Sequence, residues 1–204
     1  MINSMKIRGK TYFLWLAVIL AAIFAVLAVY FLVPKVSNPV LPVNFLTARQ
    51  NAAAISQKIV DLTVVTNQKI SAANSLDLKN DSGPALALIK EARASNNEAY
   101  AETSALAVYL QQMAASLNKI SSRSKQQVAY EAVAIELSLV SEFIVYTQKL
   151  NGFLDVLSRA IADDSFVLRQ AASGDLAAVN SQAQKINALN SEFLRRIQIF
   201  DSTN

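Results

Sequence analysis

Apolar side chains recur at steps of three and four residues along most of the chain beyond residue 44. This spacing places them on one face of an α-helix, which can then pack against a neighbouring helix. The predicted helices span about 45–79, 84–120, 124–172 and 175–200. Short polar segments separate them, and short connections favour antiparallel neighbours. The pattern therefore predicts an all-α fold: an elongated antiparallel bundle of about four long helices, coiled-coil-like where heptad spacing holds.

Two glycines decide how the third and fourth helices are divided. Asn151-Gly152 interrupts the third helix with either a kink or a true turn, and the uninterrupted apolar pattern favours one long helix that bends there. Gly174 is expected to end this helix, because glycine tolerates the left-handed backbone that follows a helix terminus. Asp175 is then expected to cap the last helix.

A second apolar pattern lies ahead of these helices. Residues Tyr12 to Val33 carry no charge, and a helix of that length spans a bilayer core of about 30 Å. Tyr12 and Trp15 near one end, and Tyr30 near the other, suit the headgroup regions. The segment is therefore interpreted as a transmembrane anchor (11–33), between a short tail (1–10) and a proline-containing linker (34–44).

Basic residues set the expected orientation of this anchor. Lys6, Arg8 and Lys10 precede it and only Lys35 closely follows it, which favours a cytoplasmic N-terminus and an extracytoplasmic body (45–204), as in a bacterial cell envelope. A cleaved signal peptide is the competing interpretation. The uncleaved anchor is favoured because the apolar run continues past Ala28. A buried core helix is disfavoured because no comparable apolar helix exists to pack against it.

Composition restricts the chemistry. The 204 residues include neither cysteine nor histidine, so thiol nucleophiles, Cys or His metal ligands and the commonest general base are missing. The chain is therefore expected to be non-enzymatic, with no cofactor and no metal. Its net charge of +4 comes mostly from the three basic residues ahead of the apolar segment. The body is nearly neutral with scattered charges, so nucleic-acid binding is not expected.

Polar residues interrupt the apolar face of the second helix. Asn96 and Thr103 lie within it, and Arg93 and Tyr100 lie beside them. Buried polar groups of this kind can fix the register between helices or line a small ligand pocket. Both interpretations stay open.

Basic residues gather at the turn between the second and third helices. Lys119, Arg123 and Lys125 could contact an anionic polymer or a partner's acidic face, although such a tip is more often solvated surface. Ser122 and Lys125 also match the S-x-x-K pattern of acyl enzymes. The companion elements of those enzymes are missing from the sequence, so Ser122 is interpreted as part of a capped, solvated turn.

Carboxylates recur on one face of the second helix, at Glu91, Glu98 and Glu102, and Asp163-Asp164 follows near the end of the third. Carboxylates on facing helices can bind a metal ion or act as acid and base. Solvent-facing charges are the simpler interpretation for both groups.

These features predict a membrane-anchored interaction or scaffold module that binds the bilayer through Tyr12–Val33. Its partner would be another envelope protein or a further copy of the chain. The alternative is a ligand-sensing, four-helix-type extracytoplasmic domain that works with a separate signalling partner.

Overall fold

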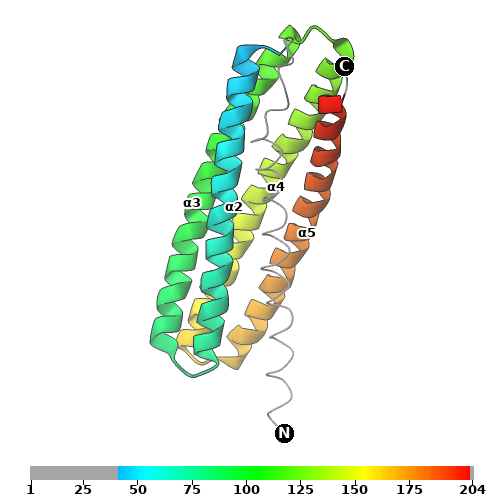
Figure 1. Cartoon of the computed structure of the whole chain (residues 1–204). Helices are drawn as coiled ribbons and strands as arrows, with labels where there is room; N and C mark the ends of the chain where they lie inside the picture. The colour runs from blue at the N-terminus through cyan, green and yellow to red at the C-terminus, as the bar shows by residue number, and fades with distance from the viewer. Residues whose placement is uncertain (1–40, 203–204) are drawn as a thin grey trace.

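The computed structural model describes residues 41–202, which are almost entirely helical and include no β-strand. The helices are α2 (Val43–Asp77), α3 (Ser82–Ser116), α4 (Arg123–Ala162) and α5 (Phe166–Ser202), with a short 3-10 helix, η1 (Leu117–Lys119), after α3. Consecutive helices run antiparallel as a bundle-like array (Figure 1). The all-α bundle of four helices is thus confirmed. The predicted tail and anchor lie outside the described residues. No helix within residues 41–202 is long and apolar enough to cross a membrane.

The turn between α2 and α3 falls where the sequence predicts it, and its geometry explains why. Asn80 has a positive φ of 61°, a conformation that asparagine tolerates better than most residues. The Asp81 N–H donates to the Leu76 carbonyl at 3.1 Å, and the Asn80 N–H donates to that of Asp77 at 3.0 Å. This pair of bonds is a Schellman motif, which satisfies carbonyls that the end of the helix leaves free.

Helix α4 continues without a break through Asn151-Gly152, which confirms the prediction of one long helix there. A side chain added at Gly152 would meet no other atom within 4 Å. No close approach therefore requires glycine at this position.

The predicted boundary between the third and fourth helices is wrong. Helix α4 ends at Ala162 instead of near residue 172, and α5 begins at Phe166. Asp164 ends α4 with a φ of 47°, and the Ser165 N–H donates to the Ala160 carbonyl at 3.1 Å. Gly174, which has no positive φ, lies inside α5, as does Asp175.

Serine side chains mark the starts of the last two helices. The Ser122 hydroxyl accepts a hydrogen bond from the Lys125 N–H at 3.4 Å and caps α4. The Ser165 hydroxyl accepts one from the Leu168 N–H, also at 3.4 Å, at the start of α5. These bonds satisfy N–H groups that the first turn of a helix cannot pair internally. Helix α2 differs, because it starts directly after Pro42 without a side-chain cap.

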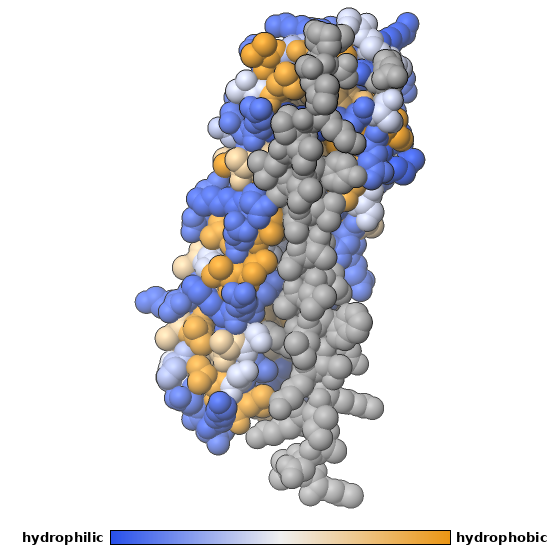
Figure 2. Space-filling model, viewed as in Figure 1, coloured by the Kyte–Doolittle hydropathy of each residue, from blue (hydrophilic) through white to orange (hydrophobic). Residues whose placement is uncertain are grey.

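The core lies between two closely packed helix pairs, α2–α3 and α4–α5, which are joined through α3 and α4. Backbone contacts between the outer helices α2 and α5 are few, and side chains of these two helices meet at both ends of the bundle. At one end Phe45 and Phe200 lie with ring centroids 6.0 Å apart. At the other end Arg169 of α5 bonds to both carboxylate oxygens of Asp77. The outer surface mixes hydrophilic and apolar areas on the visible face (Figure 2).

Candidate functional site

Asn96 of α3 is buried and holds α3 against α4. Its Nδ2 donates to the Thr147 carbonyl at 2.8 Å and to Asn151 Oδ1 at 3.0 Å. Asn151 in turn donates to Asn97 Oδ1 at 2.8 Å. These hydrogen bonds of the buried Asn96 amide form only when Asn96 lies at the same height along the bundle as its partners on α4. They therefore favour one axial alignment of the two helices. This geometry favours the register interpretation of Asn96.

The residues predicted to surround Asn96 do not gather into one cavity. Arg93 forms a partly exposed ion pair with Asp155 at 3.0 Å, which also joins α3 to α4. Tyr100 is exposed on the surface. Thr103 is buried, and its hydroxyl donates to the Ala99 carbonyl of its own helix at 2.7 Å. The structure thus brings Arg93 and Asn96 to the α3–α4 contact and leaves the other two apart.

The predicted basic cluster is only partly on the surface. Lys119 and Arg123 are exposed at the turn between α3 and α4, but the side chain of Lys125 is largely covered. Ser122 caps α4 there, as expected for a turn residue. Two of the three cations are therefore available to a partner.

The carboxylates of α3 face lysines of α2. Lys58 Nζ lies 3.0 Å from Glu98 and 2.7 Å from Glu102, and the hydrogen bonds that it donates to these carboxylates, chiefly to Glu102, raise the pKa of Lys58. Glu91 pairs with Lys69 at 3.2 Å. Opposite charges that are already paired across helices leave little reason for a metal ion. Residues 41–202 contain no group of three or more side chains suited to hold one.

The pair Asp163-Asp164 belongs to the turn that ends α4. Asp163 is exposed, and Asp164 accepts a hydrogen bond from Arg169 at 3.1 Å. The same arginine bonds to Asp77 of α2. The bonds of Arg169 therefore join the ends of α2 and α4 to the start of α5. This structural role accounts for the carboxylate of Asp164.

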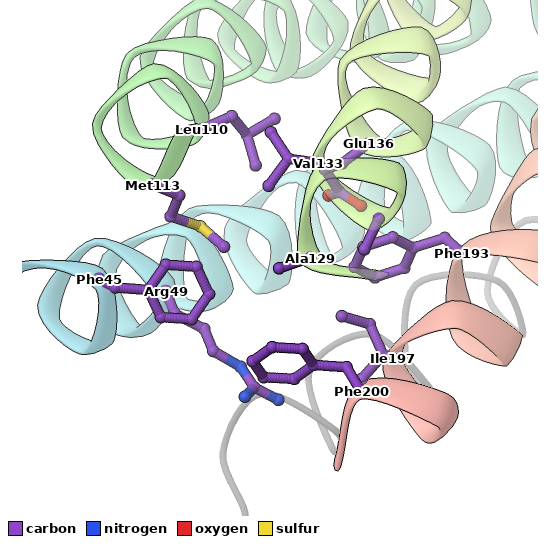
Figure 3. A pocket seen from close by; sticks show the side chains of 11 residues that line it. Phe45, Arg49, Leu110, Met113, Ala129, Val133, Glu136, Phe193, Ile197 and Phe200 are labelled. Atoms are coloured by element: carbon purple, nitrogen blue, oxygen red, sulfur yellow. The ribbon is translucent and has the colours of Figure 1, made fainter. Parts of the chain in front are cut away.

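A small pocket lies where all four helices meet, near the start of α2 and the end of α5. Its free space is about 10 Å³, which is room for roughly one water-sized group. Its wall is almost wholly apolar, and Figure 3 shows side chains from each helix turned toward it. The lining residues are Phe45, Arg49, Leu110, Met113, Ala129, Ala132, Val133, Glu136, Phe193, Ile197 and Phe200.

Glu136 of α4 is the polar group inside this wall. The residue is 2% exposed, and its Oε2 has no hydrogen-bond partner among the residues that the structure describes. Burial raises the pKa of Glu136 to about 8, because an ionised carboxylate loses its hydration in an apolar site. A buried carboxyl oxygen without a partner is uncommon and requires a specific explanation.

Arg49 of α2 occupies the outer side of the pocket. Its guanidinium lies 5.9 Å from the centre of the Phe200 ring and 3.4 Å from the carboxylate of Asp201. Among the described residues, Arg49 and Glu136 are the two ionisable groups of the pocket wall, and α3 and α5 contribute apolar side chains. The pocket thus combines aromatic rings, one buried carboxyl group and one cation that is already paired.

Glu136 was not among the site residues predicted from the sequence, although the sequence carries a signal for it. Ala132, Glu136, Leu139 and Phe143 follow the spacing of a buried helix face, and all four are buried. By spacing alone, the neighbouring Ile135 fits the same face, which hides the carboxyl group from the apolar pattern. The spacing that includes Glu136 places a glutamate in the core.

The chain was also compared with known proteins. No protein-family model, curated protein or solved structure matches it.

Proposed function

We propose that the chain is a single-pass membrane protein whose extracytoplasmic helical body acts as a non-enzymatic interaction or scaffold module. The uncharged segment Tyr12–Val33, with basic residues ahead of it, supports the anchor and its orientation. Helix α2 begins at Val43, at one end of the bundle. That end would be held near the membrane, and the helices would extend away from it by about 50 Å at 1.5 Å per residue.

The observation that carries the interaction function lies at the opposite end. Phe166 and Val167 are adjacent at the start of α5 and are 64% and 73% exposed. Figure 1 shows that the α4–α5 turn and the start of α2 are at opposite ends of the bundle. Single exposed apolar residues are ordinary, but two adjacent ones at the tip farthest from the anchor are well placed to contact a partner protein.

Site-specific photocrosslinking of the full chain in its native membrane tests this function. A photoreactive amino acid at Val167 should give one adduct of defined mass, and the additional change Phe166→Ser should weaken it. The same probe at Gln111, exposed on α3, is the matched control. An adduct of twice the chain's mass would identify a second copy as the partner. Equal adducts at both positions, or none at Val167, would contradict the proposal.

A ligand-sensing domain is the second candidate, and the pocket around Glu136 favours it. Phe45 and Arg49 belong to the first two turns of α2, directly after the linker predicted to reach the membrane. A ligand that altered the packing of these two residues would change the start of α2, which the linker connects to the predicted anchor. Such a domain would act through a separate signalling partner, whose state it would change.

A further inference from the structure

The pocket around Glu136 has the features of a binding site for a charged head group of small size. Three aromatic rings, those of Phe45, Phe193 and Phe200, belong to its wall. Figure 3 shows the Glu136 carboxyl group of α4 among the side chains that line the pocket. The unpartnered Oε2 can accept a hydrogen bond, and apolar groups supply nearly all of the remaining wall.

The size and chemistry of this space select the ligand. A protonated amine carries three N–H donors on a head about as large as a water molecule, which matches the free space of about 10 Å³. Aromatic faces attract cations, and the Arg49 guanidinium already lies against Phe200. Because the head group alone fills this space, a short alkyl chain on the amine would extend from it toward the open side of the pocket. We propose that this pocket binds a small primary alkylammonium compound, with Glu136 as the carboxylate that receives its head group.

The charges balance when such a ligand is bound. Asp201 offsets the charge of Arg49, and the ligand's cation would offset that of ionised Glu136. Because burial raises the pKa of Glu136 to about 8, the carboxyl group is mostly protonated at neutral pH without a ligand. Binding at neutral pH must therefore release the carboxyl proton to solvent. This release provides a readout that a purely apolar ligand would not give.

The proposal deepens the ligand-sensing candidate, and the interaction surface at Phe166 and Val167 is tested separately. Thermal unfolding of the full chain in detergent is measured at about pH 8.5, where an alkylammonium ion remains protonated. Propylammonium at ten times its apparent Kd should raise the unfolding midpoint by roughly 3–6 °C. Propanol lacks the charge and tetramethylammonium lacks the N–H donors, so neither should produce this shift.

Two variants identify the site. Glu136→Gln keeps the shape of the side chain but removes the charge, so it should abolish the shift caused by propylammonium. Arg49→Gln removes a competing cation and should lower the apparent Kd. A wild-type midpoint that does not change, or an equal shift in Glu136→Gln, would overturn the proposal.

Proton release gives a measurement that does not depend on unfolding. Addition of propylammonium to the wild-type chain at pH 7 in weak buffer should release close to one proton per bound ligand. Glu136→Gln should release none. Equal proton release from the wild-type chain and from Glu136→Gln would show that the head group does not pair with Glu136, which also contradicts the proposal.

Discussion

Glu136 shows how a single buried carboxyl group can make a helical bundle sensitive to its surroundings. The residue is almost fully covered, and its Oε2 lacks a partner within the described part of the chain. Its neutral form is tolerated in the apolar wall. Its charged form is disfavoured, because none of the described residues forms an ion pair with it that would replace its hydration. The folded state therefore holds a proton that the unfolded chain gives up more readily.

This difference predicts how stability depends on pH. The pKa of Glu136 rises from an ordinary value near 4.5 to about 8 on folding. Below the lower value both states are protonated, and between the two values only the folded state keeps the proton. The contribution of Glu136 to stability should thus fall as pH rises through this window and level off above about 8. Each unit of the shift is worth about 1.4 kcal/mol, so the total is several kcal/mol.

The measurement compares the wild-type chain with Glu136→Gln, because other carboxylates titrate in the same range. Denaturant unfolding of both proteins between about pH 4 and pH 9 should show the variant gaining relative stability as pH rises. A constant difference between the two curves would show that Glu136 ionises freely in the folded chain.

Asn96 illustrates the opposite case, a buried polar residue whose donors are satisfied. Replacement by alanine would leave the Asn151 side-chain oxygen and the Thr147 carbonyl without their shared donor. Asn96→Ala should therefore destabilise the chain by about 1–3 kcal/mol. Gln111→Ala, on the exposed face of the same helix, should change the unfolding free energy by less than about 0.5 kcal/mol. Similar effects of the two substitutions would contradict the register role of Asn96.

At the scale of the helices, apolar spacing was sufficient to predict their number and most of their extent. The breaks near Asn80 and Ser122 were predictable because polar residues there are followed by a new apolar face. The break at Asp164 was not, because it occurs within a continuous apolar pattern and uses an aspartate in a conformation usually given to glycine. Arg169, which bonds to Asp164 and Asp77, contributes a tertiary contact that no local pattern reveals.

Gly174 provides a direct test of this boundary. Because it lies within α5 and an added side chain would meet no other atom within 4 Å, Gly174→Ala should stabilise the chain by about 0.5–1 kcal/mol. Had Gly174 ended a helix with a positive φ, the same substitution would be destabilising. Equilibrium unfolding in denaturant separates the two results, and Gly152→Ala in α4 should behave in the same way.

The pocket was harder to predict than the helices because it is a tertiary feature. Its wall combines residues from all four helices that are up to about 155 positions apart in the sequence, from Phe45 to Phe200. Their meeting depends on the relative rotation and height of the helices, which the apolar pattern of each one does not determine. The sequence pattern therefore indicated Asn96, which joins two neighbouring helices. It did not indicate Glu136, which lies where all four helices meet.

At the scale of the whole molecule, the two ends of the bundle have different characters. The end that contains Phe45, Arg49 and Glu136 holds the pocket and would face the membrane through the linker. The other end presents Phe166 and Val167 to solvent. In the proposed function, one end would respond to a small ligand and the other would contact a partner. In this proposal, both roles are carried out by a body that stands outside the cytoplasm on a single anchor.

Labelling of single cysteines tests this arrangement most directly, since the chain has no cysteine of its own. Lys79→Cys places a thiol on the exposed α2–α3 turn, and Ser4→Cys places one ahead of the apolar segment. A membrane-impermeant maleimide added to intact cells should label full-length protein at residue 79 and should label residue 4 only after the membrane is permeabilised. Labelling of residue 4 in intact cells, or protection of residue 79, would contradict a cytoplasmic N-terminus with an extracytoplasmic body.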